Sequence, residues 1–198
     1  MKHMRNADRR DSILDAALML VFESGADSIK MHDVAARSSV SRQSLYQHFH
    51  SADELLDALY DRTYRDYLAV FEENAPGRLD EPDANVAPLE GLLQLPGPIH
   101  RIVSSAFFAG PNGRSAQMKL QRRLDDLIDA NWIRPLTASG LDHGIVTSGV
   151  YTIFASALEC RELIDRQIMT IETVRNQLTR MFEFLLRNPQ DVLPAEYA

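Results

Sequence analysis

The strongest constraint on the fold lies in residues 31–56, which hold two helical segments that are too short to be stable alone. Val34 and Ala35 form the apolar face of the first segment, and Leu45 and Phe49, four residues apart, form that of the second. Isolated helices below about 12 residues are marginal in water, so these two must pack on each other and on the segment before them. The spacing predicts a helix-turn-helix motif.

The second of these helices has an outer side made of residues that can hydrogen-bond. With Leu45 inward and about 100° of turn per residue, Gln43 and Gln47 face away from the core, and no acidic residue lies beside them. Glutamine suits adenine, arginine suits guanine or phosphate, and tyrosine and serine suit phosphate oxygens. An ordinary solvated face is the alternative, but the short helix and the missing acids favour double-stranded DNA. The candidate DNA contacts are Lys30, Ser41, Arg42, Gln43, Ser44, Tyr46, Gln47 and His48.

The same stretch resembles the helix-turn-helix of the TetR family of bacterial regulators over residues 8–60. The matching positions are Asp33-Val34-Ala35, Val40-Ser41, Leu45-Tyr46-Gln47-His48-Phe49 and Leu55, after a first helix that Gly25 ends.

The resemblance implies an all-α chain with an N-terminal three-helix helix-turn-helix DNA-binding domain and a C-terminal helical domain for ligand binding and dimerisation. The expected boundaries are residues 1–52 and 53–198, linked by a helix from residue 51. It also implies a bacterial, cytoplasmic, nucleoid-associated regulator, most often a repressor, that binds a palindromic operator as a homodimer.

Three residues depart from the family pattern in ways that weaken the expected affinity for DNA. Ser39 occupies the turn position where the family usually has glycine. If this residue has a left-handed conformation, serine costs about 1 kcal/mol there. Lys30 replaces a capping serine or threonine, and it can keep a phosphate contact but not the cap. Ala52 replaces a lysine that contacts phosphate.

The charge is distributed as a weakly basic head on an acidic body. Residues 1–50 hold seven Lys or Arg and six Asp or Glu, which gives a charge of +1. Residues 51–198 hold 14 Lys or Arg and 22 Asp or Glu, which gives −8, and the net charge of the chain is −7. Binding should therefore depend on positioned contacts in a dimer more than on bulk charge. The basic N-terminus, with Arg5, Arg9 and Arg10, indicates either an arm that enters a minor groove or a disordered tail.

Cysteine usage and hydropathy point to a cytosolic chain. Cys160 is the single cysteine, so an intramolecular disulfide is excluded and a buried thiol is expected. No apolar run reaches membrane-spanning length, and acidic residues interrupt the N-terminus, which argues against a signal peptide.

Helical periodicity continues beyond the motif. Ser51 and Glu54 form a capping box that opens a helix to about Asn74. Residues 75–98 carry five of the nine prolines and are predicted to be a linker, with a short helix near 89–95. The remaining helices are expected at about 99–109, at 115–133 before Pro135, at 143–166 after the cap Asp142, and at 170–187 from the cap Thr170.

The last two helices, at about 143–166 and 170–187, are predicted to pair with those of a second copy. The first is apolar over a wide arc and rich in small residues, which permits a close helix approach. A buried helix inside a monomer is the alternative; a palindromic operator favours the two-fold homodimer.

The helical body is predicted to bind a hydrophobic or aromatic small-molecule effector, because residues 75–187 exceed what a dimer needs. The linker helix from residue 51 would carry the change to the DNA-binding head. Candidate effector contacts are Phe107, Phe108, Trp132, Tyr151 and Phe154, with His100 and Arg101 for an anionic group.

Catalytic and metal-binding patterns are missing from the sequence. There is no Gly-x-Ser-x-Gly, phosphate-binding glycine loop, His-Glu-x-x-His or cysteine pair, and Asp125, Asp126 and Asp129 follow two arginines that favour a solvated face over a metal site. We therefore predict a ligand-responsive regulator without cofactor or metal, and not an enzyme. A helical binding protein with a weakened DNA head is the alternative, and an all-helical enzyme is a third.

Overall fold

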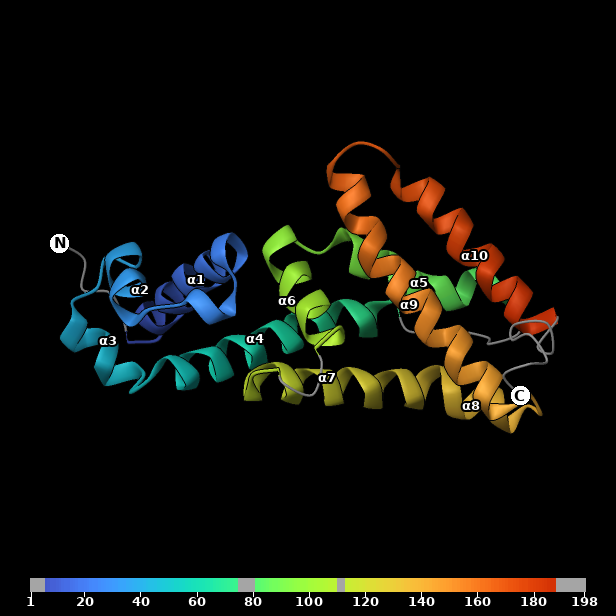
Figure 1. Cartoon of the computed structure of the whole chain (residues 1–198), viewed down its shortest axis with the longest axis horizontal. Coiled ribbons are helices and arrows are strands. Elements are labelled where there is room, and N and C mark those ends of the chain that lie inside the picture. The colour runs from blue at the N-terminus through green and yellow to red at the C-terminus, as the bar shows by residue number, and fades with distance from the viewer. Residues whose placement is uncertain (1–5, 75–80, 110–112, 188–198) are drawn as a thin grey trace. The chain divides into compact units, whose positions relative to one another are not determined.

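The computed structural model describes residues 6–74, 81–109 and 113–187, and every element assigned within these ranges is helical (Figure 1). The predicted all-α class is therefore confirmed, and none of the described helices is long and apolar enough to cross a membrane. The elements are α1 (Asn6–Ser24), η1 (Ala26–Ser28), α2 (Met31–Arg37), α3 (Arg42–His48), α4 (Ala52–Glu73), α5 (Pro82–Gln94), α6 (Gly97–Phe107), α7 (Ser115–Ile128), η2 (Asp129–Ile133), α8 (Arg134–Ala138), α9 (His143–Asp165) and α10 (Ile171–Arg187).

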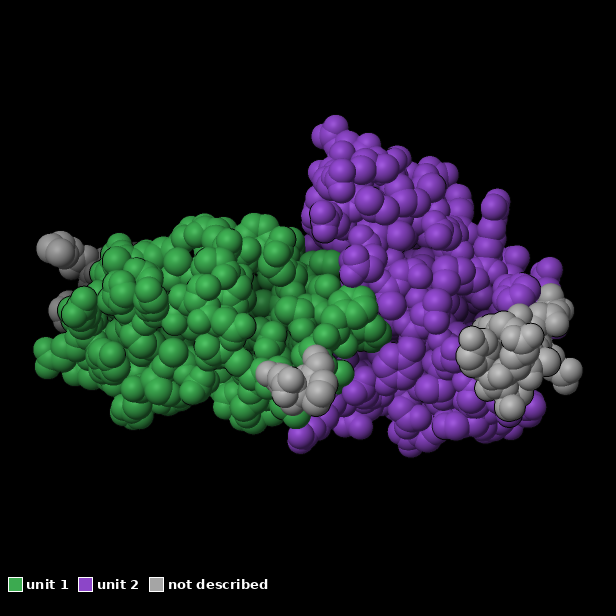
Figure 2. Space-filling model, in the orientation of Figure 1, with its two compact units in different colours: residues 1–66, 96–121 green, residues 67–95, 122–198 purple. Residues whose placement is uncertain are grey.

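The chain divides into two compact units (Figure 2). Unit 1 comprises residues 1–66 and 96–121, and unit 2 comprises residues 67–95 and 122–198. Helices α4 and α7 each begin in unit 1 and end in unit 2. The functional boundary expected at residue 52 stays a prediction, since compactness alone does not define where a function resides.

The core of unit 1 is built on α1. Its apolar face is buried, and the helix ends as expected at Gly25, whose φ of 83° suits a residue without a side chain. The amide of Gly25 donates to the carbonyl of Val21 at 2.9 Å, which satisfies the last turn. Helix α6 packs on α1, and the guanidinium of Arg101 lies 5.2 Å from the centre of the Phe22 ring. The buried residues of α1 are Ile13, Leu14, Ala16, Ala17 and Val21.

Helix α4 begins with a variant of the predicted capping box. The hydroxyl of Ser51 accepts a hydrogen bond from the Glu54 amide at 3.1 Å. The Glu54 carboxylate accepts from the amide of His50 at 2.7 Å, one residue earlier than the usual reciprocal bond. The helix starts where predicted and runs to Glu73.

Helix α5 corrects the predicted linker, because residues 82–94 form one continuous helix. Pro82 occupies the first turn, where its missing N–H is not needed, but Pro88 lies inside the helix. Tertiary packing overrides the proline, since α5 buries one side in the core of unit 2 and Gly91 lets α4 come close. A Cβ atom on Gly91 would lie 2.7 Å from Cγ1 of Val70. The large buried residues of α5 are Val86, Leu89, Leu92 and Leu93.

A second correction concerns Pro135, which does not end the preceding helix. Residues 129–133 form a π-helical turn, in which the Arg134 amide donates to the carbonyl of Asp129, five residues back, and α8 then continues to Ala138. Proline has no N–H, and its ring clashes with the carbonyl four residues before it in a regular helix. The wider π turn interrupts that regular ladder just before Pro135 and lets the chain continue.

Helices α9 and α10 form an antiparallel pair in unit 2, with the predicted bounds and caps. The Asp142 carboxylate accepts from the Ile145 amide at 3.0 Å, and the Thr170 hydroxyl accepts from the Thr173 amide at 3.1 Å. Gly149 permits close packing, since a Cβ there would lie 2.6 Å from Cδ1 of Leu185. The thiol of Cys160 is buried, as predicted.

Candidate nucleic-acid interface and ligand-binding residues

The turn between α2 and α3 is stabilised by two hydrogen bonds to carbonyl groups of α2. The Ser38 hydroxyl donates to the Val34 carbonyl at 2.7 Å, and the Val40 amide donates to the Ala35 carbonyl at 3.2 Å. Between them, Ser39 has a φ of 56°, so the left-handed conformation that normally takes glycine is present. The turn therefore forms with serine, at a cost in conformational energy.

Helix α3 is fixed from beneath by its two apolar residues. Leu45 and Phe49 are buried, and the guanidinium of Arg10 lies 5.2 Å from the centre of the Phe49 ring. This contact corrects the idea of an N-terminal arm, because α1 begins at Asn6 and both Arg9 and Arg10 are helical. The Arg5 part of that prediction lies outside the described residues.

The outward side of α3 presents hydrogen-bonding groups, and no acidic residue lies in this helix. Arg42, Gln43, Tyr46 and Gln47 are exposed, while Ser44 and His48 are half-buried. Tyr46 is 48% exposed, so its hydroxyl is accessible to a binding partner. The Ser41 hydroxyl caps the helix by accepting from the Ser44 amide at 3.1 Å, and its own hydrogen remains available to donate.

Two acidic residues of the helices before α3, Glu23 in α1 and Asp33 in α2, are paired. The guanidinium of Arg37 makes a bidentate salt bridge with the Glu23 carboxylate, with N–O distances of 2.6 and 2.7 Å. This hydrogen bonding lowers the pKa of Glu23. His32 lies 3.0 Å from the Asp33 carboxylate. Lys30 is the residue before α2 and makes no side-chain cap, so its ammonium group is not used for capping.

The candidate effector residues are distributed over both units. In unit 2, Trp132 packs edge-on against Phe154 with ring centroids 5.0 Å apart, and the Tyr151 hydroxyl donates to Asp125 at 2.7 Å. The side chain of Trp132 is fully buried, and its N–H has no acceptor among the described residues. In unit 1, His100 is buried, Phe107 packs edge-on against Phe108 at 5.1 Å, and Arg101 is placed on Phe22 as described above. Their role in ligand binding stays a prediction.

A groove of about 920 Å³ runs between α9 and α10 in unit 2. Sequence reasoning expected an apolar and small-residue surface here but not a groove, because its floor depends on how closely Gly149 lets the two helices approach. Residues on its walls include Thr152, Gln177, Met181 and Phe184, of which Phe184 is exposed.

The helix-turn-helix segment matches a known protein family. Residues 13–59 fit the family model of the bacterial regulatory proteins, tetR family. The helix-turn-helix segment is therefore similar to that of the tetR family. The matched segment contains α2, the left-handed turn and α3, so the predicted resemblance is confirmed. No curated protein matches the sequence.

Solved structures share the TetR-like fold over most of the chain. A TetR-like transcriptional regulator from Rhodococcus sp. RHA1 is 18% identical with a TM-score of 0.73, and the alignment covers 92% of this chain and 97% of that one. The fatty acid degradation regulator FadR from Bacillus halodurans is 14% identical, with a TM-score of 0.62 and coverages of 92% and 96%. The multidrug binding protein EbrR, complexed with malachite green, is 20% identical, with a TM-score of 0.62 and coverages of 88% and 98%. At these identities the likeness establishes a TetR-like fold, with an N-terminal helix-turn-helix domain and a C-terminal helical domain.

Proposed function

We propose that this chain is a ligand-responsive transcriptional repressor of the TetR family that binds a palindromic operator as a homodimer. The observation that carries the proposal is the two-sided character of α3. Leu45 and Phe49 anchor the helix in the core, while Arg42, Gln43 and Tyr46 are exposed on the other side. A short, firmly anchored helix with a hydrogen-bonding outer side fits the DNA major groove.

Within this proposal the outer residues have two kinds of role. Gln43 and Gln47, opposite the buried Leu45, read base edges, and glutamine can contact adenine through two hydrogen bonds. Contacts to phosphate fix the position of the head on the duplex without reading sequence. The residues assigned to this second role are Lys30, Ser41, Arg42, Ser44, Tyr46 and His48.

The groove between α9 and α10 supports the homodimer. Its lining combines polar residues, among them Asn176 and Arg180, with apolar ones, among them Phe184 and Met181. Burying these side chains against the same helices of a second copy removes apolar surface from water. Two-fold pairing of this kind gives the symmetry that a palindrome requires.

The proposed effector is a hydrophobic or aromatic small molecule bound within the helical domain. The ring of Trp132 packs against those of Phe71 and Phe154. An effector with a hydrogen-bond acceptor would pair with the buried N–H of Trp132. Two relatives of similar fold are named as a multidrug binding protein and as a regulator of fatty acid degradation, which agrees with this ligand class. An effector releases the operator only if it binds free protein more tightly than DNA-bound protein, and DNA must weaken its binding by the same factor.

A helical small-molecule-binding protein with a weakened DNA head is the second candidate. The strained Ser39 and the missing side-chain cap at Lys30 both favour it, because each reduces the stability of the head. Ala52, which stands where the family carries a lysine, removes a phosphate contact. These changes reduce the expected affinity without altering the outer side of α3.

A fluorescence-anisotropy titration with duplex DNA from the intergenic region beside the gene distinguishes the two candidates. A repressor should bind one such duplex at least about a thousandfold more tightly than random DNA at the same salt concentration. Equal binding of both duplexes would favour the second candidate.

A further inference from the structure

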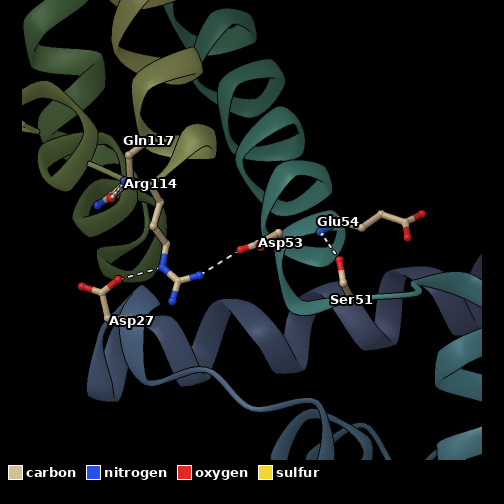
Figure 3. A network of polar contacts seen from close by, with 6 residues as sticks. All are labelled: Asp27, Ser51, Asp53, Glu54, Arg114 and Gln117. Carbon is tan, nitrogen blue, oxygen red and sulfur yellow. Dashed lines mark hydrogen bonds and ion pairs between the residues drawn. The ribbon is translucent and has the colours of Figure 1, made fainter. Parts of the chain in front are cut away.

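The start of α7 makes polar contacts with two other segments of unit 1, both near the proposed DNA-binding head (Figure 3). The guanidinium of Arg114, the residue just before α7, lies between two carboxylates. Its Nε is 2.7 Å from Asp27 in the η1 turn, and one terminal nitrogen is 3.0 Å from Asp53 in the first turn of α4.

The backbone of Arg114 is fixed by the helix that follows it. Its amide donates to the Gln117 side chain at 3.0 Å, and its carbonyl accepts from the Met118 amide at 3.0 Å. The guanidinium therefore extends from an anchored point. Figure 3 shows it reaching from α7 to η1 on one side and to α4 on the other.

The backbone hydrogen bonds within the η1 turn are long. The Ser28 amide lies 3.3 Å from the Gly25 carbonyl, and the Ile29 amide lies 3.4 Å from the Ala26 carbonyl. Distances above about 3.2 Å are weak for N–H···O bonds. Asp27, at the middle of this turn, is held from outside by Arg114.

The two ion pairs of Arg114, with Asp27 and with Asp53, are weak. Side-chain exposure is 32% for Arg114 but 89% for Asp27 and 84% for Asp53. Water and salt screen exposed pairs of this kind, so each contributes little to stability. A planar guanidinium that meets two carboxylates is nevertheless better oriented than a lysine would be.

We propose that Arg114 is a positioning residue that clasps the η1 turn of the DNA-binding head to the first turn of α4. The inference rests on the proposed function, because it concerns how the head is presented to DNA. Both heads of a dimer must be oriented before they can engage two half-sites together, and an oriented head loses less conformational freedom on binding. All three residues of the clasp, Asp27, Asp53 and Arg114, lie within unit 1.

The test compares Arg114→Met with Lys119→Met. Both substitutions remove one positive charge and one ion-pairing group at or near the start of α7. Lys119 contacts Asp57 of α4 and not the η1 turn. Backbone amide exchange is measured first, without DNA. Arg114→Met should accelerate exchange at Ser28 and Ile29 about fivefold, and Lys119→Met should leave both at the wild-type rate.

A second variant separates the clasp from general destabilisation. Asp27→Asn should reproduce the faster exchange at Ser28 and Ile29, and the double variant Asp27→Asn with Arg114→Met should add nothing further. Exchange of the buried α9 amides, such as that of Val150, should stay unchanged in all variants. Additive effects, or equal acceleration in α9, would overturn the clasp.

DNA binding is then measured with the tightest palindrome that the wild-type chain selects from a random pool. Arg114→Met should bind this palindrome about fivefold more weakly than Lys119→Met, while a duplex with one half-site binds both variants equally. Equal palindrome affinities would overturn the positioning role. A wild-type chain that selects no palindrome would overturn the proposed regulator function instead, and amide exchange would still decide whether the clasp exists.

Discussion

The hydroxyl of Tyr151 in α9 donates a 2.7 Å hydrogen bond to the Asp125 carboxylate in α7, joining two helices of unit 2. Burial, and then the hydrogen bond to Asp125, raise the pKa of this phenol above its ordinary value. Tyr151 lies three residues before Phe154 in α9, and Phe154 packs edge-on against Trp132. The hydrogen bond therefore orients one of the polar groups among the candidate effector residues.

Tyr151→Phe should lower the free energy of unfolding by about 1 kcal/mol at neutral pH, because one partly buried hydrogen bond is lost. The folded state holds the phenolic proton more tightly than the unfolded state does. The stabilisation is therefore present below the unfolded pKa of about 10 and is lost as the pH rises above it. Urea titrations near neutral pH and above about pH 10 should show a smaller alkaline loss in Tyr151→Phe than in the wild type.

Arg122→Gln serves as the control for this measurement, since the residue is exposed on the same helix and is not among the groups that raise the pKa of Tyr151. Its unfolding free energy should stay within about 0.5 kcal/mol of the wild type. An unchanged alkaline loss in Tyr151→Phe would show that other groups cause the pH dependence.

Ser39→Gly should stabilise the chain by about 0.5–1 kcal/mol, because glycine adopts positive φ without the steric cost of a side chain. Ala36→Gly, an exposed position inside α2, should have the opposite sign and lose about as much. Equilibrium unfolding in urea compares the two variants. A destabilised Ser39→Gly would mean that the serine makes a compensating contact.

Gly91→Ala should destabilise the chain by about 1–3 kcal/mol, although alanine is the better helix former. The added Cβ would overlap the β-branched Val70, which has little freedom to move away. Thermal unfolding measures the loss, and Val70→Ala in the same chain should restore part of it. A more stable Gly91→Ala would show that α4 and α5 separate at little cost.

Phe184→Glu should weaken self-association at least about tenfold if the α9–α10 groove is the dimer interface, because a buried aromatic anchor is replaced by a charge. Light scattering over a concentration series gives the dimer dissociation constant. Glu172→Gln changes an exposed residue of α10 that does not line the groove and should leave that constant unchanged. Equal constants for both variants would place the interface elsewhere.

The sequence predicted the helix-turn-helix because its signals are local. Leu45 and Phe49 lie four residues apart, Ser41 is a good cap, and Gly25 ends the first helix, so neighbouring residues alone specify each feature. The caps Asp142 and Thr170 were predictable for the same reason. Their side chains satisfy amides only three residues away.

Features that depend on distant contacts were not predictable in the same way. Pro88 indicated a linker, but α5 is stabilised by burial against α4, α9 and α10, which the local sequence does not reveal. The π turn before Pro135 likewise contains Trp132, which packs on the distant residues Phe71 and Phe154. Asp27 and Arg114 are 87 residues apart in the sequence, so nothing local signals their ion pair.

The central claim, that α3 reads DNA sequence, is tested most directly by measuring the affinity of wild type, Gln43→Ala and Tyr46→Phe for a selected palindrome and for random duplex DNA. Gln43→Ala should reduce the difference in binding free energy between the palindrome and random DNA by about 1–3 kcal/mol, since a base contact is lost. Tyr46→Phe should weaken binding to both duplexes alike, since a phosphate contact carries no sequence information. A Gln43→Ala chain that keeps the full wild-type preference for the palindrome would contradict the claim.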